Sequence, residues 1–304
     1  MRTWQRFFSH WQSWLGLLIV GTFVAVAICA PVIAPPSNPD SPADVKTVGR
    51  KTDSLPRPPS DLALLGTTTG QVDVFYGVVW GTRAALRFGL IVALSSAAIG
   101  ILAGAVSGYA GGRGSAVVMR ITDAFLAFPV IAGVWLFQLI LFPPAANTAP
   151  TPFMRFLAES NITQVMVGLI AFSWMAYARL INTTMLRLKT ADFILASQSL
   201  GAGHRRMIFR HFLPNAISPA IVLLARDIGG MVILEAAFVF IGLSSGGPWA
   251  QLLVNNRNWI IGTGGNPLTY WWVYLPPTIV LILFGIGWNL LGDGLNDALN
   301  PRDL

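Results

Sequence analysis

The chain has very few of the charged residues that a soluble protein needs on its surface. Asp, Glu, Lys and Arg make up 11% of its 304 residues, whereas hydrophobic residues make up 54%. Soluble domains carry about a quarter charged residues. So few charges cannot cover a water-exposed surface of a chain of this length, so we expect lipid to cover much of it. The composition therefore predicts an all-α membrane protein.

The chain also lacks the residues and motifs of common catalytic and metal sites. Cys29 is the single cysteine, which excludes an internal disulfide and a cysteine metal site. It lies in an apolar run, and we predict that it is a small buried residue. No HExxH or GxxxxGK[ST] pattern occurs. We therefore expect no bound metal or cofactor and no catalysis by this chain.

Charge argues against nucleic acid as a partner. The net charge is +7, and the basic residues are dispersed instead of forming a stripe interleaved with aromatic residues. Such a stripe is typical of nucleic-acid-binding proteins. The lipid bilayer is the partner that the composition predicts.

Six apolar runs are long enough to cross a bilayer, which takes roughly 20 residues of helix. The first run is longer than the roughly 7–15 apolar residues of a signal peptide, so we expect it to be retained. We therefore predict six transmembrane helices. The runs are Trp14–Ala34, Ala84–Ala110, Ala116–Phe142, Ile162–Leu186, Ile217–Leu243 and Trp271–Leu291.

The distribution of basic residues predicts that both ends of the chain are cytoplasmic, because basic loops stay inside. The loop between the fourth and fifth runs is strongly basic, whereas two outer loops hold only Arg155 and Arg257. The first outer loop departs from this trend, with Lys46, Arg50, Lys51 and Arg57. The organisation expected is a cytoplasmic N-terminus and first helix (1–34), an extracytoplasmic loop (35–82) and a five-helix core (83–304). Proline and polar residues in the 35–82 loop predict a solvated excursion without a core of its own.

Several residues predict how the helices pack. Gly100, Gly104 and Gly108 lie on one helix face, where another helix can approach closely. Pro129 is expected to kink a helix of the third run or to begin one. Trp249 and Trp259, in the last outer segment, are expected to anchor at the headgroup level.

Charge is expensive to bury in lipid, and five of the charged residues within the apolar runs are singled out for that reason. Arg226 and Glu235 are nine positions apart, so they lie on opposite helix faces and cannot pair with each other. For Arg226, Asp227 and Glu235 two interpretations stay open, a lining of a substrate route or interhelical polar bonds. Asp123 and Arg179 lie near the inner face, which favours a structural ion pair.

Residues 191–215, here called the inner loop, read ADFILASQSLGAGHRRMIFRHFLPN. Asp192 is expected to cap a short helix, and Gly201 and Gly203 to end it. Phe193 and Leu200 could then enter a groove of a partner protein, while the basic residues lie at anionic headgroups. The predicted docking residues are Asp192, Phe193, Leu195, Ala196, Ser197, Leu200, Gly201, Ala202, Gly203, Arg205, Arg206 and Pro214.

The inner loop resembles the EAA loop of permease subunits in bacterial ABC importers. That pattern is Glu-Ala-Ala, three residues, Gly, nine residues and Ile-x-Leu-Pro. Leu195-Ala196-Ser197, Gly201 and His211-Phe212-Leu213-Pro214 keep its spacing. Leu195 replaces the glutamate, so a contact made by that carboxylate is lost.

Further matches from residue 65 to residue 302 resemble the second, C-type permease of the dipeptide, oligopeptide and nickel branch. They are Leu65-Gly66-Thr67, Asp73-Val74-Phe75, Gly81-Thr82-Arg83, Ala127-Phe128-Pro129, Leu234-Glu235-Ala236, Phe240-Ile241-Gly242-Leu243 and the tail NLLGDGLNDALNPR at 289–302.

The resemblance implies the transmembrane-domain fold of a type I ABC importer in the bacterial cytoplasmic (inner) membrane. Its partners would be a second permease, two ABC ATPases that bind ATP and Mg²⁺, and an extracytoplasmic substrate-binding protein. The helix near residues 192–203 would move with its ATPase and couple it to import of di- or oligopeptides. Nickel or another small solute is an alternative substrate. A secondary transporter is one alternative, and it would require paired intramembrane charges. A membrane-embedded enzyme is another, and it would require a set of catalytic residues.

Overall fold

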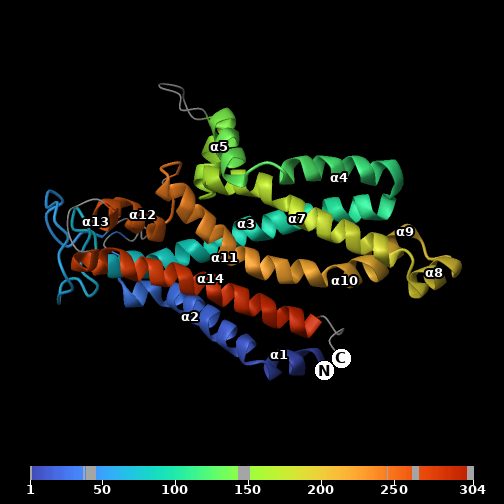
Figure 1. Cartoon of the computed structure of the whole chain (residues 1–304), viewed down its shortest axis with the longest axis horizontal. Coiled ribbons are helices and arrows are strands. Elements are labelled where there is room, and N and C mark those ends of the chain that lie inside the picture. The colour runs from blue at the N-terminus through green and yellow to red at the C-terminus, as the bar shows by residue number, and fades with distance from the viewer. Residues whose placement is uncertain are drawn as a thin grey trace. The chain divides into compact units, whose positions relative to one another are not determined.

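The computed structural model describes residues 2–36, 38, 46–142, 151–244, 246–261 and 267–299 (Figure 1). Within these ranges every regular element is a helix, and strand-like pairing is limited to isolated bridges. This confirms the all-α prediction. In the described part of the chain, four helical stretches are long and apolar enough to cross a membrane, or six if each of two bent helix pairs counts as one crossing.

Four of the predicted runs correspond to long helices. They are α2 (Trp11–Ile33), α3 (Val74–Ala110), α7 (Gln164–Leu188) and α14 (Trp271–Leu299). The fifth run corresponds to α11 (Ser218–Phe240), which is bent by 53° from the helical segment His204–Ala216 before it.

The third run, Ala116–Phe142, is not one continuous helix, and the expectation that Pro129 kinks or begins a helix is confirmed. It consists of α4 (Gly112–Leu126) and α5 (Val130–Leu141), whose axes differ by 97°. Pro129 lies at the break. It has no N–H to continue the helix, and it disfavours helical geometry in the residue before it.

The chain forms two compact units, and four helices (α2, α3, α11 and α14) contribute to both. The first unit comprises Met1–Ser13, Ile91–Asp227 and Gly292–Leu304, and the second comprises Trp14–Leu90 and Ile228–Leu291. Within the first unit lie α1 (Arg2–Ser9), α4, α5, α6 (Pro152–Glu159) and α7, followed by the inner loop.

In the first unit, α7 is the central packing partner. Glycines of α3 face it: a Cβ added to Gly100 would lie 2.2 Å from the Trp174 carbonyl oxygen, and one on Gly104 would lie 2.5 Å from that of Ala178. The predicted glycine face is therefore confirmed. Helices α4 and α5 also pack against α7 (Figure 1).

The second unit contains α2, the N-terminal part of α3, α12 (Pro248–Asn255), α13 (Arg257–Ile261), η2 (Pro267–Tyr270) and parts of α11 and α14. Gly287 lets α14 approach α2, because an added Cβ there would lie 2.6 Å from Ile19 Cγ2. The indole N–H of Trp80 donates to the Ala34 carbonyl at 2.9 Å, which fixes α3 against the end of α2.

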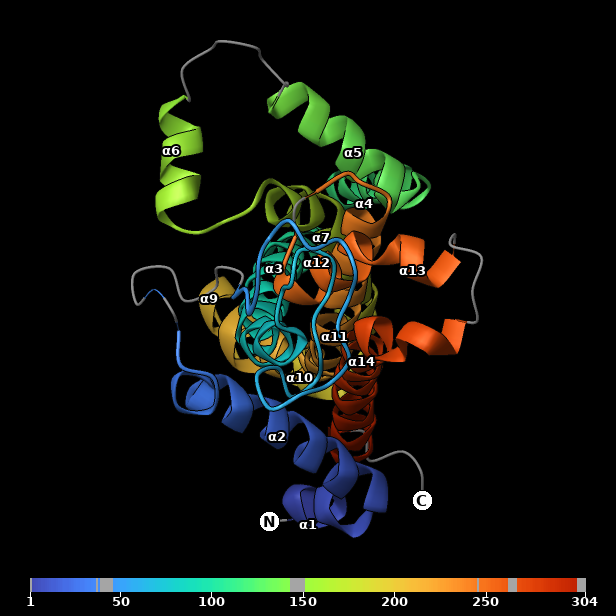
Figure 2. The same cartoon turned by 90° about the vertical axis from the view of Figure 1, so that its left-hand side faces the viewer.

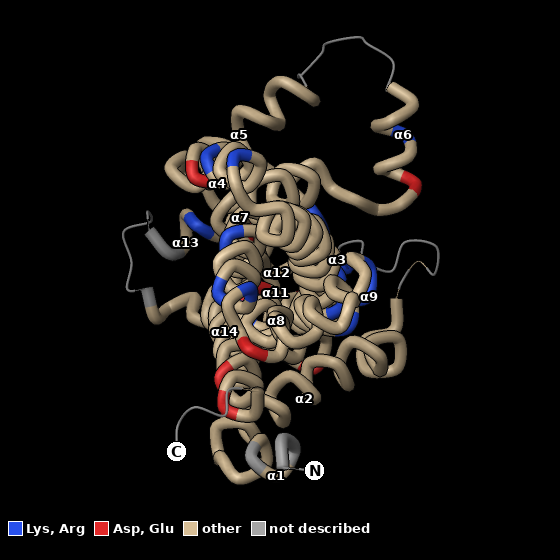
Figure 3. Tube along the Cα trace, turned by 90° about the vertical axis from the view of Figure 1, so that its right-hand side faces the viewer, with Lys and Arg blue, Asp and Glu red and all other residues tan. Residues whose placement is uncertain are grey.

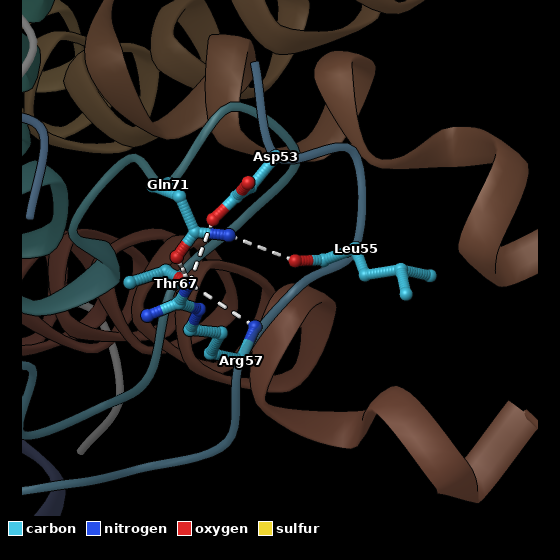
Figure 4. Close-up of polar contacts among 5 residues, drawn as sticks. All are labelled: Asp53, Leu55, Arg57, Thr67 and Gln71. Carbon is cyan, nitrogen blue, oxygen red and sulfur yellow. Dashed lines mark hydrogen bonds and ion pairs between the residues drawn. The ribbon is translucent and has the colours of Figure 1, made fainter. Parts of the chain in front are cut away.

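Residues 46–73 of the outer loop are folded, so the prediction of a solvated excursion was wrong for them. Gln71 is buried and donates to the Leu55 carbonyl at 2.8 Å, and the Thr67 hydroxyl donates to Gln71 Oε1 at 3.1 Å (Figure 4). The backbone N–H of Arg57 donates to Thr67 Oγ1 at 3.1 Å. Composition misled here because hydrogen bonds of buried polar side chains help to hold this segment together. Residues 37 and 39–45 lie outside the described part.

Two single-residue predictions, for Trp249 and Cys29, also fail in the second unit. Trp249 is buried and its indole N–H donates to the Val78 carbonyl at 2.8 Å. The Trp259 indole N–H donates to Thr69 Oγ1 at 2.7 Å, and its expected position at the headgroups stays a prediction. Cys29 is exposed instead of buried. An apolar run does not reveal which of its faces the rest of the chain covers.

Figure 2 shows residues 46–73 beside α12 and α13, and the polar contacts agree. Asn256, between α12 and α13, accepts at 3.4 Å from the Thr69 N–H through its side-chain oxygen and is fully buried. The loop and the two short helices therefore form one folded cap at the N-terminal end of α3.

Candidate functional site

The inner loop begins with the short helix that the sequence predicts, α8 (Asp192–Ser199). Gly201 ends it with φ +75°, and the N–H groups of Ala202 and Gly201 donate to the carbonyls of Ser197 and Gln198. This is the Schellman arrangement, which favours glycine at the left-handed position. The prediction that Gly201 ends this helix is therefore confirmed.

Two details of that prediction were wrong. The N-cap residue is Ala191, and no side chain makes a capping hydrogen bond, so Asp192 does not cap the helix. It lies in the first turn instead, where a carboxylate still complements the positive end of the helix dipole. Gly203 has φ −67° and is the N-cap residue of the next helix, so it does not end α8.

The rest of the inner loop is helical with changing geometry. Helix α9 (His204–Arg206) leads into a π-helical segment, η1 (Met207–Phe212), and then into α10 (Leu213–Ala216). Pro214 lies in the first turn of α10, where a residue without an N–H is tolerated. A π-helical segment is rare and frequently marks a functional position.

One side of α8 is anchored in the core of the first unit. Ile194 is fully buried and packs in a cluster with Met207 and Phe212 of η1 and with Ile181 and Met185 of α7. Outside that cluster, Tyr109 of α3 makes a hydrogen bond to Nδ1 of His204. The inner loop is thereby attached to both α3 and α7, so a displacement of α8 is transmitted to two long helices.

The other side of α8 exposes apolar side chains, here called the docking face. Phe193, Leu195 and Leu200 are 44%, 47% and 89% exposed. The hydroxyls of Ser197 and Ser199 donate to carbonyls within the helix, at 2.7 and 3.0 Å, so they offer no free donor to a partner. Leaving apolar area in water costs about 25 cal/mol per Å², which favours burial of this face.

Basic residues lie next to the docking face. Arg205, Arg206 and Arg210 are exposed, and in Figure 3 blue Lys and Arg segments lie around α9 and on α4. A cleft of about 570 Å³ opens beside the inner loop in the first unit. Its lining comes from the end of α7, from α10, from the start of α11 and from the end of α14.

Each ionisable residue that the sequence singled out has a partner in the structure. The predicted pair is confirmed, because Arg179 Nη1 lies 2.9 Å from Asp123 Oδ1. Arg226 and Glu235 do not pair with each other, as predicted, and the structure supplies the partners that sequence reasoning missed. Those partners are Asp293 for Arg226, the hydroxyl of Tyr177 for Asp227 at 2.7 Å and the N–H of Gly247 for Glu235 at 2.9 Å.

Comparison with known families matches most of the chain. Residues 100–302 match the family described as binding-protein-dependent transport system inner membrane component. Residues 1–53 match the N-terminal transmembrane domain of oligopeptide transport permease C.

Three individual relatives align with most of this chain and over most of their own length. The oligopeptide transport system permease protein OppC of Bacillus subtilis is 29% identical over 98% of this chain and 88% of its own length. The probable D,D-dipeptide transport system permease protein DdpC of Escherichia coli is 31% identical over 81% of this chain and 75% of its own. The glutathione transport system permease protein GsiD of Pectobacterium atrosepticum is 29% identical over 98% and 90%.

Proposed function

Because the chain belongs to the family of binding-protein-dependent transport system inner membrane components, we propose that it forms half of the pathway through which an ABC importer moves di- or oligopeptides. Its place as an inner-membrane permease subunit follows from the family. The three relatives described above are named for oligopeptides, D,D-dipeptides and glutathione, which are all peptides. Those names support peptides over nickel or another small solute.

We further propose six membrane crossings with both chain ends in the cytoplasm. The two bent helix pairs, α4 with α5 and His204–Ala216 with α11, bring the candidate crossings to six. The basic residues of the inner loop support a cytoplasmic position for it. Residues 35–82 are then extracytoplasmic, and the folded part of that loop faces the substrate-binding protein.

The docking face supports the proposal that α8 couples an ATPase subunit to the membrane helices. An ATPase with an apolar groove would bury Phe193, Leu195 and Leu200, and Ile194 on the opposite side would transmit its movement to α7. ATP and Mg²⁺ bind the two ATPase subunits, and this chain contributes no catalytic residue and binds no cofactor. A second permease completes the pathway.

Leu200→Glu and Gly201→Asp test this coupling. Leu200→Glu places a charge in the groove, and Gly201→Asp puts a side chain at a left-handed position that glycine occupies at lower cost. Both variants should reach the membrane and lose the ATPases on purification. Leu62→Glu is the matched control, because Leu62 is as exposed but lies in the outer loop. Normal ATPase co-purification and normal peptide uptake in both inner-loop variants would refute the proposal.

For Arg226 and Asp227 the contacts favour interhelical bonding over a pathway lining. Arg226 pairs with Asp293 of α14, and Asp227 accepts from Tyr177 of α7. A secondary transporter remains the competing class. Uptake that continues after the partner ATPases are inactivated would favour it over the importer.

A further inference from the structure

Helix α12 is seated in a groove of α3 that two glycines create. A Cβ added to Gly81 would lie 2.2 Å from Trp249 Cδ1, and one added to Gly77 would lie 2.8 Å from Leu252 Cδ1. The Trp249 indole N–H donates to the Val78 carbonyl between them at 2.8 Å. The two large side chains of α12 therefore fit only where α3 has no side chain.

Trp249 also contacts two other long helices of the same unit. Its ring centroid lies 5.9 Å from that of Phe23 in α2 and 5.6 Å from that of Phe284 in α14, and the two phenylalanines are 5.2 Å apart. Each pair meets edge to face, a favourable aromatic arrangement. The space left beside Trp249, against Glu235 and Gly81, is only about 10 Å³. One side chain thus fills the junction of several helices.

Glu235 of α11 holds the N-terminus of α12. Its side chain is 6% exposed, and Oε1 accepts from the N–H of Gly247, the N-cap residue of α12, at 2.9 Å. A buried carboxylate is costly unless hydrogen-bonded, and the N-terminus of a helix complements its charge. Gly246, the residue before Gly247, has φ +48°, and a Cβ added there would clash with the Val239 side chain.

We propose that Glu235 is the positioning residue that holds α12 in its groove, and that α12 stays seated throughout the transport cycle. This inference rests on the proposed function as an importer subunit. Unseating α12 would leave the Gly247 N–H, the Trp249 indole and the Glu235 carboxylate unpaired at once. Any opening of the pathway therefore moves this part of the second unit as one rigid body.

A disulfide between residues 84 and 247 tests whether α12 stays seated. A Cβ built on Gly247 lies 3.8 Å from Ala84 Cβ, the separation found in disulfides. Ala84→Cys and Gly247→Cys are made in a Cys29→Ser background, because Cys29 is the only native thiol. Oxidation in membranes should give near-complete cross-linking, and peptide uptake should be the same before and after reduction. Uptake that oxidation abolishes and reduction restores would overturn the proposal.

The rate of this cross-linking reports the role of Glu235 directly. Glu235→Leu removes the acceptor and should slow disulfide formation roughly tenfold. Glu235→Gln keeps an acceptor oxygen and should slow it less. If Glu235→Leu does not reach the membrane, Glu235→Asp, whose carboxylate is one methylene too short, takes its place. Equal rates in all Glu235 variants would refute the positioning role.

The controls separate this inference from the proposed function. Gly21→Cys with Gly247→Cys is the negative pair, because a Cβ on Gly21 has nothing within 4 Å. Cross-linking rates are measured in membranes without ATP, so they do not depend on transport. Co-purification of the ATPases with the same cysteine variants reports the importer assignment separately.

Discussion

Ile194 is the residue whose loss should disconnect α8 from the membrane helices without altering the docking face. It is fully buried and packs on the cluster formed by η1 and α7, whereas Phe193 and Leu200 point outward. Ile194→Ala removes buried methyl groups from that cluster. Such substitutions cost about 2–5 kcal/mol, and Ile→Val costs about 0.5–1.5 kcal/mol.

Those energies predict a large shift in where α8 lies. An eight-residue helix is marginal by itself, so α8 depends on its packing to stay docked. A loss of about 2–5 kcal/mol raises the undocked population by roughly 30-fold to 5,000-fold. The docking face is intact, so the ATPases should still bind, but their hydrolysis should no longer drive uptake.

The assay combines hydrogen exchange with coupling measurements. In Ile194→Ala, amides of α8 should exchange faster than in the parent, and the ratio of ATP hydrolysed to peptide imported should rise. Ile194→Val is the matched control and should change both only slightly. Parental exchange rates in α8 of Ile194→Ala would refute the reasoning, because they would show that Ile194 does not anchor the helix.

Two further predictions follow from helix contacts, one in each unit. Burial raises the pKa of Asp73, whose Oδ1 accepts from the N–H groups of Phe75 and Tyr76 at the start of α3. Because the folded state then binds the proton more readily than the unfolded state, stability should fall as pH rises from about 4. Asp73→Asn keeps the cap and should abolish that fall in thermal unfolding of the purified protein; an unchanged pH dependence would contradict the assignment. Gly104→Leu should force α3 from α7 and lower the yield of folded protein in detergent, whereas Gly21→Leu, in open space, should not. Equal yields of the two variants would argue against the close contact.

The glycine and ionisable residues illustrate what could be predicted from the sequence. The four-residue spacing of Gly100, Gly104 and Gly108 fixes them on one helix face, so close packing follows from helix geometry alone. The nine-residue spacing likewise excludes an Arg226–Glu235 pair. The spacing does not identify the residues that Arg226 and Glu235 do contact. Those residues, Asp293 and Gly247, are brought close to them only when the chain folds.

The outer segments show the opposite case. The composition of residues 46–73 indicated no core, yet Gln71 and Thr67 are buried there. The Thr67 hydroxyl donates to the Gln71 side chain, and the Gln71 side chain donates to the backbone carbonyl of Leu55, 16 residues away. Trp249 was expected at the headgroups but is buried against α3. Hydropathy scores a residue by its type, and it does not record which neighbour satisfies a polar atom or covers a ring.

The sequence by itself therefore determined the membrane class, the positions of the apolar runs and the short helix ended by Gly201. These depend on local periodicity and on the left-handed backbone that glycine allows. Only the tertiary structure decided that Ile194 anchors that helix while Leu200 remains exposed, and that Glu235 holds α12. Those contacts join residues that are far apart in the chain or on opposite sides of one turn. They stabilise the protein only after the helices have packed.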